Sequence, residues 1–296
     1  MKTYKAAAVS LAALAPASST WAAPTSPSPK SPSLKSAASG EWAASVAGRE
    51  AALSAEKLSR AGLSEAGYAF KKRVYLLHVE RGTQSGRARI FDLPPSQLAL
   101  IPGTGIKMRQ DAAQALGRLL QAARADLARD LQAPAGSEEV EARRARARRV
   151  EKLDINNAYR SASLQFAIWN RNFLRYYQAT ASERRQAPGG EHGEAAAEIL
   201  RDYVGVRVAA PGFSNHQSGI AVDFALALKP APRQPAPATR LAASMEQGDP
   251  WRQSWFWLWL KARAGEFGFV EYEPEPWHWE FKPAAAPTPK NTARKP

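Results

Sequence analysis

The chain of 296 residues contains no cysteine, only four histidines, and fewer acidic than basic side chains. Without cysteine it can form neither a disulfide framework nor a thiolate metal site, and a lipid-anchored lipoprotein is excluded. No apolar run reaches the ~20 residues that a membrane-spanning helix needs. A hydrophobic content of 45% is typical of a globular protein with a sizeable core and excludes a wholly disordered one.

The shortage of acidic residues leaves a net charge of +14 and an isoelectric point near 10.1. Such a charge attracts polyanions, whether nucleic acid, anionic lipid or the anionic polymers of a cell envelope. Much of it lies in the arginine-rich run 143–149, which has no interleaved aromatic residue for stacking on bases. We therefore expect no specific nucleic-acid partner and interpret the run as a solvated helix face beside Glu138, Glu139 and Glu141. Electrostatic attraction to envelope polymers stays open.

The beginning of the chain has the outline of a secretory signal peptide. A basic start, residues 1–5, precedes a short apolar run, and Thr20-Trp21-Ala22 offers small residues at the −3 and −1 positions of a cleavage site. An alanine-rich leader without a targeting role is the alternative. We expect an exported protein without a transmembrane segment, located in the periplasm or cell envelope after cleavage.

Composition divides the chain further. A Pro/Ser/Lys-rich linker (24–40) should follow the signal peptide (1–23), and a Pro/Ala/Lys-rich disordered tail (283–296) should end the chain. Between them we expect a mainly helical region, 41–149, and a core domain, 150–282. Apolar spacing and composition predict helices over 41–62, 108–131, 161–177 and 251–265, and strands over 74–79 and 150–159. Five prolines in the segment 228–250 indicate an irregular surface loop near the site. His78, inside an apolar run, is interpreted as a core residue.

Two short segments carry the chemistry. Residues 214–223 read SNHQSGIAVD, and Glu275-Pro276-Trp277-His278 follows near the end. Two histidines and one aspartate suffice as protein ligands of a catalytic zinc with an open fourth position. On a strand 220–224 Asp223 shares a face with Ala221, and on a strand 277–281 His278 shares one with Glu280. Neighbouring strands would then present Asp223 and His278 to one metal, with His216 reaching in from the preceding loop.

These segments resemble known motifs. SNHQSGIAVD is similar to the SxHxxGxAxD motif of LAS metallopeptidases (lysostaphin, D-Ala-D-Ala peptidases, hedgehog-type domains), and EPWHWEF is similar to their ExWH motif. The run 159–165, YRSASLQ, resembles the YRS…Q segment of VanY-type D-alanyl-D-alanine carboxypeptidases, although Ala158 stands where many relatives have glycine. The resemblance covers roughly residues 150–282, with the motifs in the family's order.

The resemblance implies an α+β fold, in which a small, mostly antiparallel sheet carries the zinc site, helices pack on it, and the N-terminal helical region is an addition. It implies one zinc ion on His216, Asp223 and His278. Glu275 would be the general base, with Glu271, Glu273 and Glu280 as alternatives. Arg160 would hold a substrate carboxylate or carbonyl, with Gln165 and Ser214 as supporting substrate contacts; alone, Arg160 would read as a surface residue.

The implied function is that of a zinc peptidase that removes the terminal D-Ala from peptidoglycan stem peptides. An endopeptidase with the same chemistry is the close alternative, because the motifs do not determine the bond that is cut. A non-catalytic wall-binding domain and a basic polyanion-binding protein with a structural metal are the others. The first should lack the glutamate, and the second should have four protein ligands. Of the six tryptophans between 251 and 279, we expect most in the core and one or two along the groove.

Overall fold

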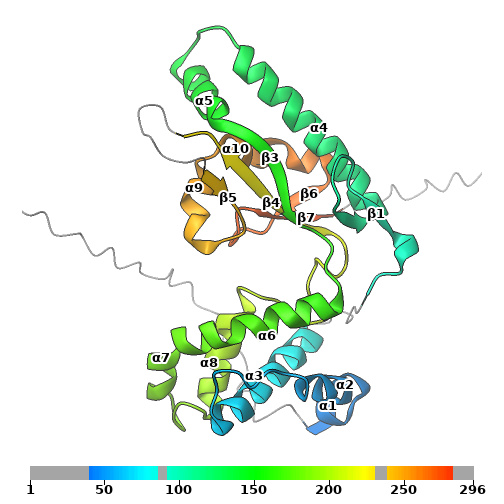
Figure 1. Ribbon diagram of the computed structural model, residues 1–296, viewed down its shortest axis with the longest axis vertical. Coiled ribbons are helices and arrows are strands. Elements are labelled where there is room, and N and C mark those ends of the chain that lie inside the picture. Colours follow the sequence, from blue (N-terminus) through cyan, green and yellow to red (C-terminus); the bar gives the residue numbers. More distant parts are fainter. Residues whose placement is uncertain (1–39, 86–91, 231–238, 283–296) are drawn as a thin grey trace, which may run out of the picture. The chain divides into compact units, whose positions relative to one another are not determined.

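A five-stranded antiparallel sheet organises the computed structural model, which describes residues 40–85, 92–230 and 239–282 (Figure 1). The strand order is β3-β4-β7-β6, and β5 pairs with β4 outside that path. The strands are β3 (Val150–Asn157), β4 (Ala221–Leu228), β5 (Thr239–Leu241), β6 (Phe269–Glu271) and β7 (His278–Phe281). The predicted strands at 150–159, 220–224 and 277–281 are thus confirmed to within a few residues.

Strand β4 is buried on both faces, and its alternation divides two environments. Val222, Phe224 and Leu226 belong to the hydrophobic core under the helices, whereas Ala221 and Asp223 lie on the opposite face. The predicted division of faces on this strand is therefore correct. It leaves Asp223 on the face away from the large core.

Helices cover the core face of the sheet. The longest, α4 (Gln110–Gln132), follows the hairpin of β1 (Leu98–Leu100) and β2 (Lys107–Arg109) and buries a stripe of alanine and leucine. Trp259 of α10 donates a hydrogen bond to Asp126 of α4 at 2.9 Å, which ties the two helices together. The remaining elements here are η1 (Pro95–Gln97), α5 (Glu138–Arg149), η2 (Met245–Gln247), α9 (Gly248–Arg252), α10 (Trp255–Arg263) and η3 (Ala264–Phe267).

A second hydrophobic core lies within a group of helices around α3, α6 and α8. Trp169 and Phe173 of α6 pack against each other with their rings tilted, and Tyr75 of α3 meets Trp169 edge-on. Trp169 also donates a hydrogen bond to the buried His78. The group consists of α1 (Gly40–Ala44), α2 (Val46–Ala55), α3 (Glu65–Gln84), α6 (Ala162–Ala179), α7 (Ala181–Gln186) and α8 (Glu194–Gly205). The predicted core position of His78 is confirmed.

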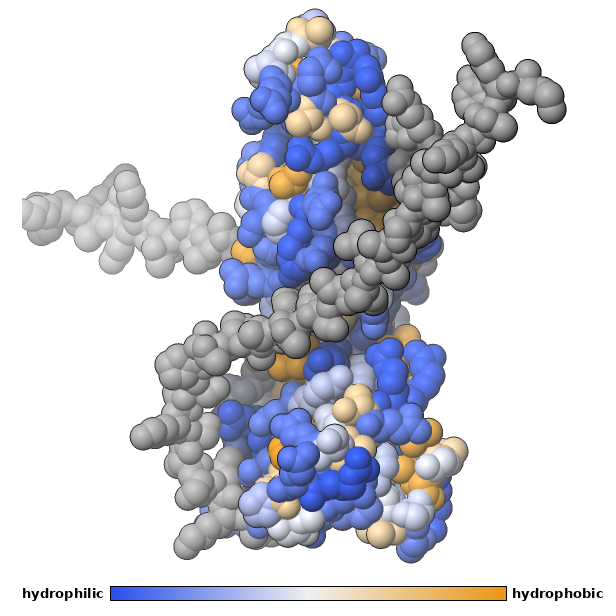
Figure 2. All heavy atoms as spheres, turned by 90° about the vertical axis from the view of Figure 1, so that its left-hand side faces the viewer, coloured by the Kyte–Doolittle hydropathy of each residue, from blue (hydrophilic) through white to orange (hydrophobic). Residues whose placement is uncertain are grey.

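The arginine-rich run forms α5, in which only Ala147 is buried. Its first turn is acidic and its last turn basic, which complements the helix dipole. The run is therefore the solvated helix face that its composition predicts. Figure 2 shows a mostly hydrophilic face with scattered hydrophobic residues, and no helix among the described residues has the length and apolarity to cross a membrane.

Four local predictions are wrong. The predicted helix 41–62 is interrupted, since α1 ends at Ala44 and Ser45 caps α2, which ends at Ala55. Residues 74–79, predicted as a strand, lie inside α3, because a helix buried on several sides also carries a continuous apolar run. The segment 228–250 is not all surface loop: Leu241 of β5 is buried and pairs with Leu226 of β4. The predicted helix 251–265 is interrupted, since Ser254 caps α10 by accepting a hydrogen bond from the Trp257 amide. The predicted signal peptide, most of the linker and the tail lie outside the described residues.

Candidate active site and metal centre

The backbone brings the three predicted metal ligands together. Asp223 of β4 and His278 of β7 are direct cross-strand partners. His216 lies in the turn before β4, which closes at Gly219. There φ is +66°, and an added Cβ would lie 2.9 Å from the backbone nitrogen of Arg109, so only glycine fits this close approach. The turn and the strand register together position His216 over the same carboxylate as His278.

The ligand atoms of these three side chains lie within 4.8 Å of one another. Asp223 Oδ2 is 3.3 Å from His216 Nε2, and Asp223 Oδ1 is 2.9 Å from His278 Nδ1. Burial raises the pKa of Asp223, but the two imidazoles outweigh it and hold that pKa well below its usual range. The cluster therefore contains a buried carboxylate that is ionised at neutral pH.

The protonation state of His216 determines whether one of its ring nitrogens can bind a cation. Its Nδ1 lies 2.6 Å from the carbonyl oxygen of Ala158, which can only accept, so Nδ1 carries the proton. Burial lowers the pKa of His216 and favours the neutral ring. Its buried Nε2 makes no hydrogen bond and faces Asp223 with a lone pair. A lone pair and a carboxylate directed at one point are the donor set that a divalent cation such as zinc takes.

Glu280 and Asn215 support His278 from behind. Glu280 Oε1 lies 3.4 Å from His278 Nε2 and accepts a hydrogen bond of 2.6 Å from Asn215 Nδ2. The hydrogen bond with His278 lowers the pKa of Glu280 to about 2, so this carboxylate stays ionised. An acceptor at Nε2 directs the other ring nitrogen, Nδ1, toward Asp223. Glu280 is thereby engaged in orienting an imidazole.

Glu275 approaches the cluster from the turn between β6 and β7. Its backbone amide donates to the Tyr272 carbonyl and its carbonyl accepts from the His278 amide, which fixes the turn. Glu275 Oε2 lies 3.8 Å from His278 Nδ1. Burial raises the pKa of Glu275 to about 7. A carboxylate with such a pKa can both take and release a proton near neutrality.

The other carboxylates predicted as alternative bases are engaged elsewhere or exposed. Glu271 accepts hydrogen bonds from Trp257 and from Lys261. Glu273 is exposed on the turn, and Glu280 serves His278. Glu275 has a hydrogen bond with Trp277 but no cationic partner other than the candidate ligand His278 and Arg160, so among these four glutamates the geometry favours Glu275 as the group beside the candidate metal ligands.

Arg160 lies at the junction of β3 and α6, where Ser161 caps the helix. Its Nη2 is 3.5 Å from Asp223 Oδ2, and its Nη1 donates to Gln165 Oε1 at 3.3 Å. Gln165 in turn donates to the Ala209 carbonyl and is almost fully buried. Gln165 therefore holds the Arg160 guanidinium beside the candidate metal ligands.

Ser214 is also buried, and its hydroxyl oxygen accepts the His216 amide at 3.3 Å. The contact stabilises the turn that carries His216. All seven predicted site residues thus lie around one centre. Within that centre, the contacts of Gln165 and Ser214 are with the protein itself.

Two cavities adjoin this centre, of about 520 Å³ and about 380 Å³. Both are lined by Arg160, Arg207, Val208 and Glu275. Five of the six tryptophans are buried in the core, as expected for most of them, and the sixth, Trp257, is partly buried against it. One of the five, Trp277, also lines the larger cavity. Sequence patterns gave no sign of Asn215, Arg175 or Arg207, since single polar residues on a loop or amphipathic helix look like surface residues.

The comparison with protein families agrees with the motifs found at residues 159–165, 214–223 and 275–281. A family model described as VanY, D-alanyl-D-alanine carboxypeptidase, matches residues 105–284. The comparison with curated proteins gives no match.

Several solved structures are similar to the chain at 18% identity. VanYB in complex with D-alanine-D-alanine matches with a TM-score of 0.37, over 65% of this chain and 84% of that one. A mutant of the vancomycin resistance D,D-pentapeptidase VanY in complex with Zn(II) has a TM-score of 0.35, over 65% and 85%. The LD-carboxypeptidase LdcB also has a TM-score of 0.35, over 64% and 69%. Since the family model spans more than half of the chain and includes all three candidate ligands, the chain belongs to the VanY family of D-alanyl-D-alanine carboxypeptidases.

Proposed function

We propose that this protein is a zinc-dependent carboxypeptidase that removes the terminal D-Ala from peptidoglycan stem peptides ending in D-Ala-D-Ala. The observation that carries the proposal is the buried cluster of His216, Asp223 and His278, with Glu275 beside it at 3.8 Å from His278. Membership of the VanY family supports the substrate class. His216 would bind zinc through Nε2, His278 through Nδ1, and Asp223 through a carboxylate oxygen.

A bound zinc ion would supply Lewis-acid activation of a water molecule and of the scissile carbonyl. Glu275 takes the proton of the attacking water, which its pKa of about 7 permits at neutral pH. It then passes that proton to the leaving amine, so that one carboxylate acts as base and then as acid. Gln165 and Asp223 position the guanidinium group of Arg160, which binds a substrate carboxylate or carbonyl oxygen.

Two features of the sequence support a location in the envelope. The start of the chain has the outline of a signal peptide, and the substrate lies outside the cytoplasmic membrane. The net charge of +14 would favour residence among anionic envelope polymers. Recovery of a mature chain beginning near Ala23 from the envelope fraction would support this part of the proposal, and intact Met1 in the cytoplasm would contradict it.

An endopeptidase is the second candidate, because cavities on two sides share Arg160 and Glu275. A site open on both sides can accept a chain that continues past the scissile bond. Incubation of the zinc-loaded protein with defined muropeptides, followed by mass spectrometry, decides between the two. A loss of one D-Ala from pentapeptides supports the carboxypeptidase, and cleavage inside a stem or cross-bridge supports the endopeptidase. No cleavage by zinc-loaded protein would contradict both.

A further inference from the structure

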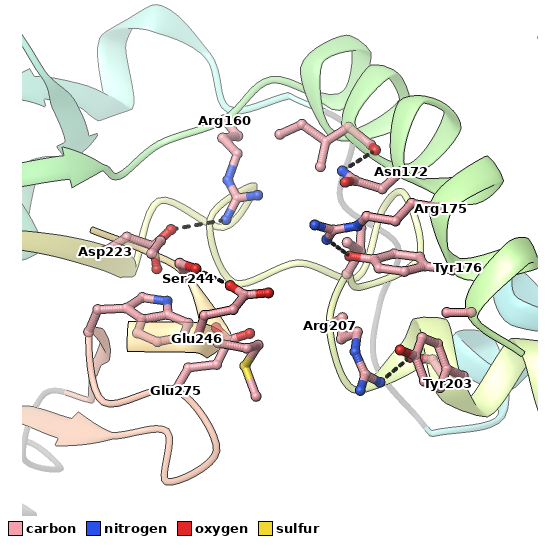
Figure 3. Close-up of a pocket in the computed structure, with 16 residues that line it drawn as sticks. Arg160, Asn172, Arg175, Tyr176, Tyr203, Arg207, Asp223, Ser244, Glu246 and Glu275 are labelled. Atoms are coloured by element: carbon pink, nitrogen blue, oxygen red, sulfur yellow. Dashed lines mark hydrogen bonds and ion pairs between the residues drawn. The ribbon is translucent and has the colours of Figure 1, made fainter. Parts of the chain in front are cut away.

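The larger of the two cavities has one wall that the proposed chemistry does not use. This wall consists of residues from α6, from the end of α8 and from the segment that follows α8, with Arg175 on α6 and Arg207 just after α8 (Figure 3). Figure 3 shows them across the cavity from Glu246 and Glu275. Because Arg160 also lines this cavity, the wall is continuous with the candidate active site.

Both guanidinium groups are supported by tyrosines. Arg207 lies over the Tyr203 ring at 3.6 Å and donates to the Tyr203 carbonyl at 2.8 Å. Arg175 lies 5.0 Å from the Tyr176 ring and donates to its hydroxyl at 3.3 Å. The two tyrosine rings contact each other edge-to-face. Stacking on a fixed ring restricts an arginine, so less entropy is lost when it binds a ligand.

The charge of Arg175 helps to lower the pKa of Glu246 across the cavity, but neither arginine forms an ion pair in the part of the chain that the structure describes. Other arginines of the same helical group do: Arg201 pairs with Glu198 and Asp202, and Arg184 with Glu191. The nearby Glu246 lines the opposite wall and accepts a hydrogen bond from Ser244 instead. The guanidinium donors that do not reach tyrosine are therefore available to a ligand in the cavity.

From this arrangement we infer that Arg175 and Arg207 form a subsite for a second carboxylate of the peptide substrate, distinct from the group held by Arg160. The inference rests on the proposed function and specifies its substrate: a peptide ending in D-Ala-D-Ala with an unamidated carboxylate on a preceding residue. Planar guanidinium groups bind carboxylates through paired, charge-assisted hydrogen bonds. A carboxamide has no charge and offers only one acceptor oxygen, so the site discriminates between the acid and its amide.

The test uses two synthetic peptides that end in D-Ala-D-Ala, alike except for one group. One carries a γ-linked D-Glu with a free α-carboxylate, and the other carries its α-amide. The zinc-loaded wild type should hydrolyse the acid with a kcat/KM about tenfold or more above that of the amide. The double variant Arg175→Gln/Arg207→Gln should lose this preference through KM while its kcat/KM for the amide changes less than about threefold.

Arg171→Gln is the matched control, because Arg171 lies exposed on the same helix and does not line the cavity. It should retain the preference, and circular dichroism should show that all variants are folded. Equal rates for both peptides in the wild type, or an undiminished preference in the double variant, would overturn the inference.

A protein that hydrolyses neither peptide would refute the proposed function without deciding the subsite. In that case calorimetric binding of the same two peptides decides it. Tighter binding of the acid by the wild type, lost in the double variant, supports the subsite. Equal affinities contradict it.

Discussion

The imidazole Nδ1 of His216 lies 2.6 Å from the carbonyl oxygen of Ala158, across 58 residues of chain. The contact joins the end of the β3 segment to the turn before β4, and it fixes the proton on Nδ1. A backbone carbonyl performs this role, so alanine at this position keeps it where many relatives have glycine. The first ligand is therefore oriented by the main chain and the second, His278, by the side chain of Glu280.

The support of His278 by Glu280 predicts an effect on metal affinity. Glu280→Ala should weaken zinc binding by ~10–100-fold, the usual consequence of losing the partner of a ligating histidine. Glu280→Gln should fall between it and the wild type, because the amide oxygen can still accept but carries no charge. Competition with a chromophoric chelator measures the affinity. Glu273→Gln, on the exposed turn, should bind zinc normally, and wild-type affinity in Glu280→Ala would refute the role.

The position of Arg160 predicts a loss of turnover without a loss of metal. Arg160→Lys keeps the positive charge beside Asp223 but lacks the planar fork that binds two oxygens at once. We expect normal zinc content and a normal circular dichroism spectrum, with kcat/KM reduced by about tenfold or more. Steady-state kinetics and metal analysis on one preparation check both. Full activity in this variant would make Arg160 a structural residue only.

The metal cluster could be predicted from sequence because its geometry is local to two strands. Alternation places Asp223 and His278 on the same face of the sheet once β4 pairs with β7, and the turn that closes at Gly219 adds His216. The strands of the sheet and the helix 110–132 could also be predicted, because their apolar residues recur with the period of a strand or of a helix. Residues whose roles depend on distant packing gave no pattern: Arg175 and Arg207 meet at one cavity only because α6 and α8 pack together.

A segment that is buried on several sides lacks the regular spacing of apolar and polar residues that distinguishes a helix from a strand. Residues 74–79 of α3 contact neighbours on more than one side, so their apolar run has no helical gap and resembles a strand. In the segment 228–250, prolines suggested irregular structure, yet Leu241 fills the core and pairs with β4. Neither outcome follows from local sequence, because both depend on which elements pack around the segment.

The burial of His78 predicts a pH-dependent stability. Burial, with a smaller contribution from Arg201, lowers the pKa of His78 to about 4 from the usual 6.5. Between pH ~6.5 and pH ~4, His78 therefore binds a proton in the unfolded chain but not in the folded protein. The contribution of His78 to the free energy of unfolding should be fully present above pH ~6.5. It should fall by roughly 1.4 kcal/mol per pH unit down to pH ~4, a total loss of roughly 3 kcal/mol.

Chemical denaturation of the wild type and of His78→Asn, at several pH values between ~7.5 and ~4, isolates this contribution. The variant should be less stable near neutrality, because the smaller side chain leaves part of the buried imidazole's volume unfilled, although its Oδ1 can still accept from Trp169. It should lose less stability on acidification than the wild type. Parallel pH profiles for the two proteins would show that His78 does not titrate differently in the folded and unfolded states.

Glu275 is the group proposed to move the proton during hydrolysis. Burial raises its pKa to about 7, and its carboxylate lies 3.8 Å from His278 Nδ1 without a hydrogen bond to any metal ligand. Glu275→Gln keeps the shape and removes the basic oxygen. Zinc content should stay intact while kcat falls by ~10²–10⁴, the usual contribution of a general base.

Glu271→Gln is the matched control, because Glu271 pairs with Lys261 and accepts from Trp257 on the far side of the turn. Its loss should reduce stability slightly and leave kcat within about threefold of the wild type. If Glu275→Gln kept its zinc and lost less than about tenfold in kcat, the base would be another group. Loss of zinc from Glu275→Gln would instead make Glu275 a fourth ligand, and the open coordination position that the proposed hydrolysis needs would be absent.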